Sequence, residues 1–410
     1  MKKKNPYFLL VLILGALSTI SPFSIDMYLP AFPAIAKSLD TDISKVQLSL
    51  TSYLIGIAFG QLFYGPLLDK YGRKKPLYAG LFLYIAASVG CAFTNSVESL
   101  IAMRFLQAIG GCAGMVAAQA LVRDIFPVNK IAQAFALLTL VIAVSPMIAP
   151  TLGGYITAHF DWHWMFILLA VITALILLAI KWTLPTGAEP DRKISLRPAK
   201  VARKYLEVMK NKQFLTYILV GGIAGAAPFA YIAGSSDVFI NIYGLTETQY
   251  GWLFAFLAVA MIGSTQMNHL LLVKYSSQKI IRVALSYQML VGLVIIGGVW
   301  FDVFNVWALI GSMFIFLTGH GLSVPNAAAL SLAPFDQNAG SASAMMGFMR
   351  MALGGIVSAL VSFFHNGTAI PMVVLMAACI LGGGLVLLVY HNKIKFHLPK
   401  SKKKQTCVAH

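Results

Sequence analysis

Four charged side chains lie inside long apolar segments, where an ionised group is costly to keep and is a candidate for function. They are Asp26, Arg104, Asp237 and Arg350. A buried carboxyl group can take up and release a proton, and a buried guanidinium group can pair with an acid or with an anionic ligand. The chemistry indicated is therefore proton exchange and ligand binding in an apolar environment.

Asp26 and Arg104 carry the most specific hypothesis. On the expected helix boundaries, Asp26 lies about ten residues and Arg104 about six residues below the outer helix ends, so at ~1.5 Å per residue both occupy the outer half of a membrane. Burial raises the pKa of a carboxyl group, whereas a neighbouring arginine lowers it. We hypothesise that Asp26 carries a transported proton opposite Arg104. The alternative is a fixed Asp26–Arg104 pair that only holds helices together.

The segment around Arg104 has one small or polar face. Arg104, Gln107, Gly111, Gly114 and Ala118 follow a spacing of three and four residues, which places them on one stripe of a helix. A stripe with a charge at its outer end is expected to line a cavity. The alternative is that Gly111 and Gly114 pack against a neighbouring helix.

Two further charges are open to two interpretations each. Asp237 lies near the outer end of the seventh apolar segment, where it is either a solvated residue at the mouth or a second proton site. Arg350 lies near the middle of the eleventh segment among several methionines. A fixed cation facing a cavity would disfavour cationic ligands and favour neutral or anionic ones. Alternatively, Arg350 pairs with backbone carbonyls or with His320.

Five residues are predicted to bind a substrate, namely Tyr53, Gln107, Tyr231, Asp237 and Arg350. The two tyrosines are chosen because they are aromatic residues with a polar tip in segments expected to line a cavity. Methionines and aromatics could form an adaptable apolar pocket there. The alternative for each aromatic is an ordinary lipid-facing or interfacial position.

The elements that must position these residues are membrane helices. The 410 residues are 59% hydrophobic and 11% charged, with a mean hydropathy of +0.78. Apolar stretches of about 20 residues recur throughout, and in lipid each must satisfy its own backbone polar groups as a helix. We predict an all-α membrane protein with twelve spans, at 7–35, 46–68, 76–94, 98–121, 131–157, 163–184, 214–241, 248–273, 280–301, 304–330, 338–364 and 369–391.

The distribution of basic residues supports this count. With twelve spans and both termini in the cytoplasm, only Lys37 and Lys45 of the 31 lysines and arginines fall in outward-facing loops, and Arg104 and Arg350 lie within spans. The others, which include Lys2, Lys3 and Lys4, face inward, as the positive-inside rule predicts. The net charge of +17 therefore indicates contact with anionic lipid headgroups, and no nucleic-acid partner is expected. Scattered cysteines, among them Cys407, predict no disulfide, metal or cofactor.

The chain is expected to divide into two similar halves. A long polar stretch from Pro185 to Lys212 separates six spans from six, which gives an N-terminal bundle (1–190), a basic cytoplasmic linker (191–213) and a C-terminal bundle with a tail (214–410). Residues 198–209 of the linker are expected to form a surface helix. Short matches between residues 118–121 and 327–330 indicate duplication, which is usual in transporters that rock around a central site.

The loop between the second and third spans has a specific pattern. It reads from Gly65 to Lys75, with Asp69, Gly72 and Arg73 within it. This pattern resembles the signature loop of the major facilitator superfamily. Physically, Gly65 would let two helices approach closely, Gly72 would permit a tight turn, and Asp69 could hold a neighbouring helix end or an arginine.

Three other segments extend the resemblance. Residues 104–111 are similar to the helix-4 arginine motif of that superfamily, and residues 145–154 resemble the Pro/Gly motif of its drug-exporting branch, with Pro146, Pro150, Gly153 and Gly154. Prolines and glycines bend a helix and let it pack closely. Residues 25–33 together with Arg123-Asp124 resemble the bicyclomycin/chloramphenicol-resistance (Bcr/CflA) family.

The resemblance implies the major facilitator fold, with two pseudo-symmetric six-helix bundles, in a bacterial inner membrane. It implies a secondary active exporter that exchanges protons for small drug-like molecules, expected to act as a monomer. The alternative is a proton-coupled importer of a small nutrient on the same fold. The chain lacks a Gly-x-x-x-x-Gly-Lys-Ser/Thr phosphate loop and common hydrolase motifs, so neither an enzyme nor an ATP-driven pump is expected.

Overall fold

The computed structural model describes residues 6–185, 187–335 and 339–391. The predictions that concern Lys2, Lys3, Lys4, Cys407 and the basic tail lie outside the described residues.

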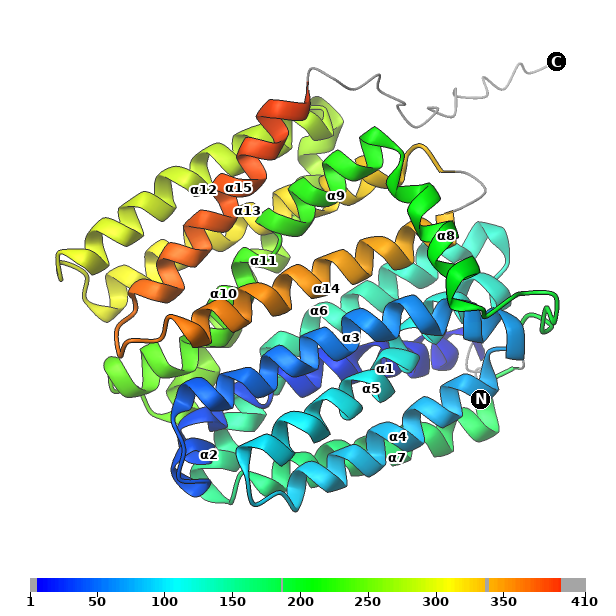
Figure 1. Cartoon of the computed structure of the whole chain (residues 1–410), viewed down its shortest axis with the longest axis horizontal. Helices are drawn as coiled ribbons and strands as arrows, with labels where there is room; N and C mark the ends of the chain where they lie inside the picture. Colours follow the sequence, from blue (N-terminus) through cyan, green and yellow to red (C-terminus); the bar gives the residue numbers. More distant parts are fainter. Residues whose placement is uncertain (1–5, 186, 336–338, 392–410) are drawn as a thin grey trace, which may run out of the picture.

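The described chain is helical, and twelve segments are long and apolar enough to cross a membrane (Figure 1). No predicted span boundary differs from these segments by more than four residues, which confirms the twelve-helix prediction. The helices are α1 (Pro6–Asp26), α2 (Phe32–Ser38), α3 (Ile43–Tyr71), α4 (Lys74–Ala92), α5 (Val97–Ile125), α6 (Val128–His159), α7 (His163–Thr183), α8 (Pro198–Met209), α9 (Lys212–Ala224), α10 (Ala227–Ser236), α11 (Glu247–Lys274), α12 (Ser277–Trp300), α13 (Val306–Leu332), α14 (Ala339–Phe363) and α15 (Ile370–His391).

The first span of each half is interrupted, although a continuous helix was expected in both. In the first span, α1 ends at Asp26, and a short 3-10 helix, η1 (Leu29–Ala31), leads into α2. In the seventh span, α9 and α10 meet near Gly225, and a π-helical turn, η2 (Asp237–Ile242), follows. Proline lies in the first turn of η1, α2 and α10, where its missing N–H is tolerated, and this starts a new helical segment.

The helices form two groups that meet along two main contacts. One group consists of α1 and α3 to α7 and the other of α9 to α15, and each of these helices packs against at least one other helix of its own group. The main contacts between the groups are α3 with α14 and α6 with α11. In Figure 1 the earlier group occupies the lower part of the view and the later group the upper part.

Helix α8 crosses one end of the bundle, which we call the linker end (Figure 1). The Tyr205 hydroxyl donates a 2.8 Å hydrogen bond to the backbone oxygen of Leu62 in α3. Tyr205 also belongs to an apolar cluster with Phe214, Ala342 and Met345 of the later group. The linker helix therefore contacts both groups. The other end of the bundle, which carries α2, is called the opposite end.

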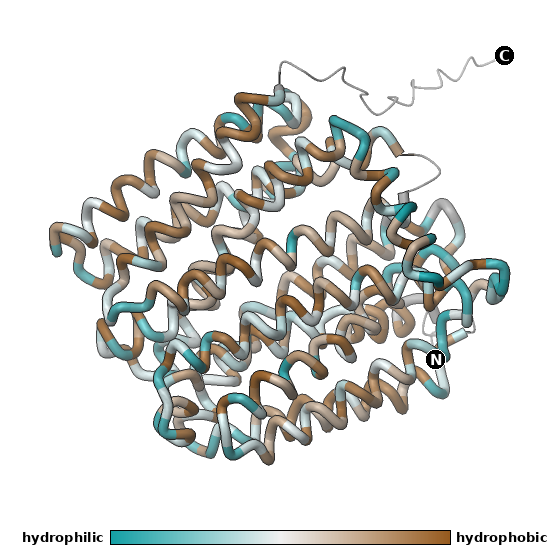
Figure 2. Tube along the Cα trace, viewed as in Figure 1, coloured by the Kyte–Doolittle hydropathy of each residue, from teal (hydrophilic) through white to brown (hydrophobic). Residues whose placement is uncertain are grey.

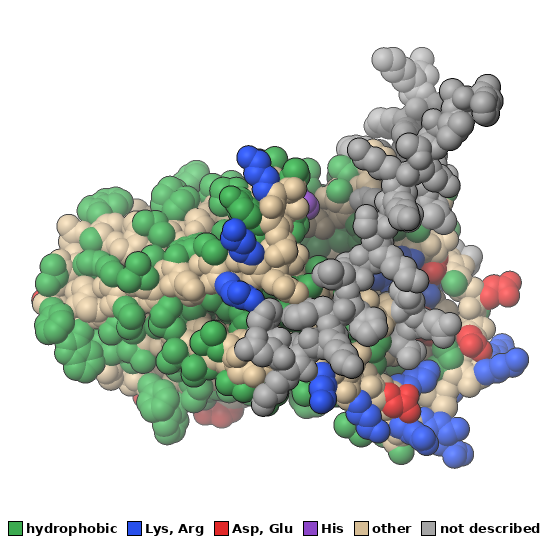
Figure 3. Space-filling model, turned by 90° about the horizontal axis from the view of Figure 1, so that it is seen from above, with side chains coloured by type: hydrophobic (Ala, Val, Ile, Leu, Met, Phe, Trp, Pro, Cys, Tyr) green, Lys and Arg blue, Asp and Glu red, His purple; other side chains and the backbone are tan. Residues whose placement is uncertain are grey.

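Apolar residues predominate in the middle of the bundle, and hydrophilic residues gather at its two ends (Figure 2). Large apolar side chains such as Trp252, Leu270 and Leu388 are exposed on the outside of the bundle. A soluble protein rarely exposes so much apolar surface, whereas lipid tails cover it at no cost. Figure 3 shows lysine and arginine side chains at the linker end and none at the far left of the view.

Candidate functional site

A cavity of about 920 Å³ lies between the two helix groups at the linker end. It is lined by residues of α3, α5, α8, α9, α13 and α14, so both groups and the linker helix contribute to it. Its lining begins at helix ends, with Asp69 and Asp124, and extends to Arg350 in the middle of α14. The volume falls within the range of pockets that hold drug-sized ligands.

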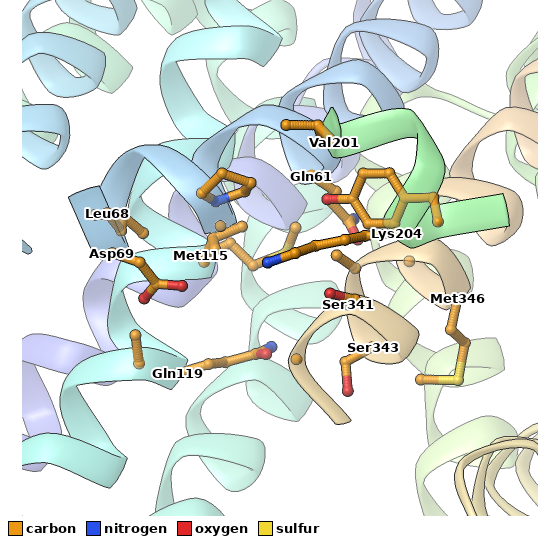
Figure 4. A pocket seen from close by; sticks show the side chains of 18 of the residues that line it. Gln61, Leu68, Asp69, Met115, Gln119, Val201, Lys204, Ser341, Ser343 and Met346 are labelled. Atoms are coloured by element: carbon orange, nitrogen blue, oxygen red, sulfur yellow. The ribbon is translucent and has the colours of Figure 1, made fainter. Parts of the chain in front are cut away.

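The walls of the cavity combine apolar and amide side chains. Met115 of α5 and Met346 of α14 lie on facing walls, with Gln61 and Gln119 beside them (Figure 4). Lys204 extends from α8 across the cavity in the same view. Gln61, Gln119 and Lys204 were not predicted as site residues, although an amide within an apolar span is a detectable signal.

The two groups are packed tightly at the opposite end, where the Pro/Gly motif of α6 meets α11. A side chain added at Gly154 would overlap the backbone oxygen of Glu247, and a Cβ at Gly251 would lie 2.7 Å from the backbone oxygen of Pro150. The absence of side chains thus lets the two backbones touch. The role of Pro146 and Pro150 in conformational change stays a prediction.

The contact between α3 and α14 also reaches the opposite end. The Ser362 hydroxyl donates a 2.5 Å hydrogen bond to the backbone oxygen of Ser44, and the Thr51 hydroxyl donates to the Ser358 hydroxyl at 2.9 Å. The cavity therefore lies on the linker side of a region in which the two groups are joined by direct backbone and hydroxyl contacts.

Asp26 lies at the C-terminal end of α1, at the place where the first span is interrupted. Its side chain is buried, and within the described part of the chain it has no hydrogen-bond or ion-pair partner. It interacts electrostatically with Tyr231 and Tyr250, which belong to the later helix group. Asp26 therefore faces the contact between the groups, and it does not line the cavity.

Among the described residues Arg104 forms no ion pair with Asp26, so the alternative of a fixed Asp26–Arg104 pair does not hold in this conformation. The Arg104 guanidinium donates to the side-chain oxygen of Gln107 at 2.6 Å and to the backbone oxygen of Ser24 at 3.2 Å. It also lies over the rings of Tyr28 and Tyr53, at 4.4 and 4.1 Å from their centroids. The last carbonyls of a helix lack intrahelical partners and attract cations, which explains why Arg104 turns to the end of α1.

The small stripe on α5 faces α1, and the prediction that it lines a cavity is wrong. A Cβ at Gly111 would lie 2.6 Å from the Ser21 hydroxyl, and one at Gly114 would lie 2.9 Å from the backbone oxygen of Leu17. Ala118 is fully buried. The alternative of helix packing therefore holds for this stripe.

Asp237 is buried, which rules out a solvated mouth residue in this conformation. Its carboxylate accepts hydrogen bonds from Asn241 and from the Nε2 atom of His365, each at 2.8 Å. Both contacts lie within the later helix group. Among the described residues Asp237 therefore has side-chain partners, whereas Asp26 has none.

The signature loop takes part in an ion-pair cluster at the cavity mouth. Arg73 contacts Asp69 at 2.5 Å and Asp124 at 2.7 Å. Burial disfavours the charged form of Arg73, but its hydrogen bonds to Asp124 and Asp69 prevail and raise its pKa above the usual value. Gly72 has φ of +80°, which favours glycine and agrees with the expected tight turn.

The close helix approach expected at Gly65 is absent. A Cβ at Gly65 would meet no atom within 4 Å, because the residue lines the open cavity. The Asp69 carboxylate holds an arginine, as one of the two expectations had it, and this is Arg73 of its own loop. Its backbone oxygen accepts a 2.9 Å hydrogen bond from the backbone N–H of Asp191 in the linker.

Of the five predicted substrate-binding residues, Arg350 alone lines the cavity. Tyr53 and Gln107 contact Arg104, Tyr231 stacks on Phe254, and Asp237 pairs with His365. These four residues lie closer to the opposite end, in the packed part of the bundle. Their role in binding a substrate stays a prediction.

Twelve spanning helices in two groups, with a cavity between the groups, are typical of membrane transport proteins. The family model described as "Major Facilitator Superfamily" matches residues 14–359, and the chain belongs to this family. Solved structures share its fold. A bacterial homologue of the human lysosomal transporter Spinster, in an inward-facing and occupied conformation, superposes with a TM-score of 0.75 at 13% identity, covering 95% of this chain and 98% of that chain.

Sequence relatives narrow the comparison. A "Bicyclomycin resistance protein homolog" from Haemophilus influenzae is 34% identical over 93% of this chain and 95% of the relative. A "Chloramphenicol resistance protein" from Pseudomonas aeruginosa is 28% identical over 89% of this chain and 86% of the relative. "Multidrug resistance protein D" from Escherichia coli is 28% identical over 88% of this chain and 89% of the relative. The predicted resemblance to the bicyclomycin- and chloramphenicol-resistance branch is confirmed.

Proposed function

We propose that this chain is a proton-driven exporter of small drug-like molecules in a bacterial inner membrane. In this proposal the linker end faces the cytoplasm and the opposite end faces outward. The substrate enters the cavity from the cytoplasm, and a proton travels inward through Asp26. The observation that supports this proposal most is the placement of two features between the helix groups. Asp26, which has no side-chain partner among the described residues, is buried toward the opposite end, and the cavity opens at the linker end.

The charge distribution supports the orientation. Arg73, Lys74, Arg123, Lys181 and Lys204 all lie at or near the linker end of their helices, and the basic residues of α8 lie there too. Lys37 and Lys45 are the basic residues near α2. Basic residues are retained on the cytoplasmic side of membrane proteins, where lipid headgroups are anionic.

The export of drug-like molecules is supported by the cavity and by the relatives. The relatives are named for resistance to bicyclomycin, to chloramphenicol and to multiple drugs. Methionine side chains on facing walls of the cavity can adapt to ligands of different shapes. Such a wall suits a transporter that accepts several small molecules.

The position of Asp26 supports a proton site. An ionised carboxylate without a partner is costly inside a membrane, so this group is expected to exchange a proton as its surroundings change. It lies within electrostatic reach of Tyr231 and Tyr250, which belong to the other helix group. Separation of the groups at the opposite end would therefore replace two tyrosines by water at Asp26.

Alternating access then follows from which end is packed. With the opposite end closed, the cavity is open to the linker end. Rocking of one group against the other along α3–α14 and α6–α11 would close the cavity and expose Asp26 outward. Proton uptake at Asp26 from the outside would favour the return to the closed contact, because a neutral carboxyl group is easier to bury. Loss of that proton toward the cytoplasm, when a drug molecule enters the cavity, would complete the exchange.

Everted membrane vesicles test the proposal. Respiration acidifies the vesicle interior, which corresponds to the outside of the cell. We expect a drug such as chloramphenicol, added to the medium, to accumulate inside and to release protons, measured by dequenching of a pH-sensitive dye. An uncoupler should abolish the accumulation. Vesicles from cells without the chain are the control. Accumulation that resists an uncoupler, or no accumulation across a drug panel, would contradict the proposal.

A further inference from the structure

Arg350 is a cation without a partner in the cavity. Within the described residues it makes no hydrogen bond and no ion pair, and its Nε atom is buried without a hydrogen-bond partner. It lies eleven positions after the start of α14 at Ala339, which is roughly 16 Å along the helix. The cavity therefore ends at a guanidinium whose donors are unused.

The acids that line the cavity are far from this guanidinium. They are Asp69, Asp124 and Asp191. Asp69 and Asp124 lie within the last turn of α3 and α5, where they contact Arg73, and Asp191 belongs to the linker. All three mark the mouth, so no lining acid lies at the depth of Arg350.

His320, which interacts with Arg350, cannot neutralise its charge. His320 of α13 is buried, interacts electrostatically with Arg350 and has a buried Nδ1 atom without a hydrogen-bond partner. An imidazole is neutral or positive and never supplies a negative charge. The pairing of Arg350 with His320 that the sequence allowed is therefore no charge compensation.

The described lining as a whole carries excess positive charge. The basic residues are Arg73, Arg123, Lys193, Lys200, Lys204 and Arg350, against the three acids named above. A cation that enters must pass this field, whereas an anion is attracted by it. The apolar side chains of the lining include Met346, Met351 and Val324, which would hold an apolar body in the same cavity as the charged group.

We propose that the cavity binds small organic anions, in which a carboxylate or similar oxyanion pairs with Arg350 and an apolar ring rests on the methionine wall. This inference rests on the proposed function, because it names the substrate class of the same cavity. Arginine presents paired N–H donors in a planar fork that matches a carboxylate. The ligand thus supplies the negative charge that the described protein residues lack at this depth.

Three dansyl probes test the proposal by binding, with no proton gradient. Dansylglycine is an anion, dansylglycinamide is its neutral analogue, and dansylcadaverine is a cation with the same fluorophore. Their affinities are measured by dansyl fluorescence with the full chain purified in lipid nanodiscs. A charge-assisted hydrogen bond in a dry site is worth roughly a tenfold to hundredfold change in affinity. We expect wild-type protein to bind dansylglycine at least about tenfold more tightly than the amide.

The variants separate recognition of the charge from a structural role. Arg350→Gln should reduce dansylglycine affinity to that of the amide and leave the amide affinity within about twofold. Arg350→Lys should retain part of the preference, because it keeps the charge and loses the fork. Arg203→Gln is the matched control, since it makes the same change on α8 at a side chain that is 83% exposed and lies outside the cavity lining.

Several outcomes would overturn the proposal. These are equal affinity of wild-type protein for the anion and the amide, tighter binding of dansylcadaverine, no binding of dansylglycine, and an equal loss of all probes in Arg350→Gln. A chain that passes the vesicle test and prefers neutral probes would contradict this inference alone. A chain that prefers dansylglycine and fails the vesicle test would contradict the proposed function alone.

Discussion

Gly153 of α6 lies directly against the backbone carbonyl of Met27, the residue that follows Asp26. A side chain added at Gly153 would overlap the Met27 oxygen. The next residue, Gly154, makes the corresponding contact with Glu247 of the other helix group. Two neighbouring glycines on one helix thus join the candidate proton site on one side and the contact between the groups on the other.

The first prediction concerns this junction. Gly153→Ala should displace α6 from the interrupted segment of the first span, because the backbone oxygen cannot move as a flexible side chain can. Overpacking of this kind costs about 1–3 kcal/mol, so we expect a lower unfolding temperature in detergent and slower transport. Gly263→Ala is the control, since a Cβ there meets no atom within 4 Å. Equal behaviour of the two variants would show that the close approach is unimportant.

The second prediction concerns the proton. Asp26→Asn keeps the shape of the side chain and removes its ability to release a proton. We expect it to abolish uptake driven by a proton gradient in everted vesicles, while exchange of labelled for unlabelled drug continues. Asp42→Asn is the control, because it makes the same change at an exposed acid whose side chain forms no cap hydrogen bond. Full gradient-driven uptake by Asp26→Asn would remove Asp26 from the mechanism.

The third prediction concerns Arg104, whose contacts are all within the first helix group. Arg104→Ala would leave the buried oxygen of Gln107 without its donor and remove the cation from the faces of Tyr28 and Tyr53. We expect a loss of about 2 kcal/mol or more, seen as a lower unfolding temperature in detergent. Arg104→Lys should lose less, since the charge stays but the planar fork is gone.

The same change at Arg203 provides the comparison for Arg104. The Arg203 side chain is 83% exposed and pairs loosely with Glu207 at 3.4 Å. Exposed pairs contribute little, so Arg203→Ala should leave the unfolding temperature nearly unchanged. If Arg104→Ala were as stable as Arg203→Ala, its contacts would contribute nothing to the fold.

The fourth prediction concerns the ion-pair cluster at the cavity mouth. Asp124→Asn removes the stronger contact of Arg73 and weakens the hydrogen bond that Asp124 accepts from the backbone of Ala188. The side chains of Arg73 and Asp124 are only 13% and 12% exposed. We therefore expect the substitution to lower the free energy of unfolding by about 1–3 kcal/mol, with little dependence on salt. Unfolding temperatures at low and high salt provide the measurement.

A nearby acid outside the ion-pair cluster serves as the control for Asp124→Asn. Glu189 lies in the same exposed stretch and is not a partner of Arg73. Glu189→Gln should leave the unfolding temperature unchanged. A loss in Asp124→Asn that disappears at high salt would mean that the pair is solvated and only weakly held.

The amino-acid sequence alone determined the twelve helices and the family. Each span must bury its own backbone polar groups in lipid, so length and hydropathy suffice to place it to within four residues. The same local logic identified Asp26, Arg104 and Arg350, because a charge inside an apolar segment is visible without knowing the fold. The tight turn at Gly72 could be predicted in the same way, because glycine adopts a positive φ whatever its neighbours are.

The tertiary structure decided which way each of these side chains faces. Spacing placed Arg104 on a small stripe of its helix but could not reveal that α1 ends opposite it and offers the Ser24 carbonyl. It could not reveal that Asp26 lies within electrostatic reach of Tyr231, or that Arg350 lines a cavity in which the described acids lie only at the mouth. Such contacts join residues from distant helices, and helix packing sets them through shapes that hydropathy does not encode.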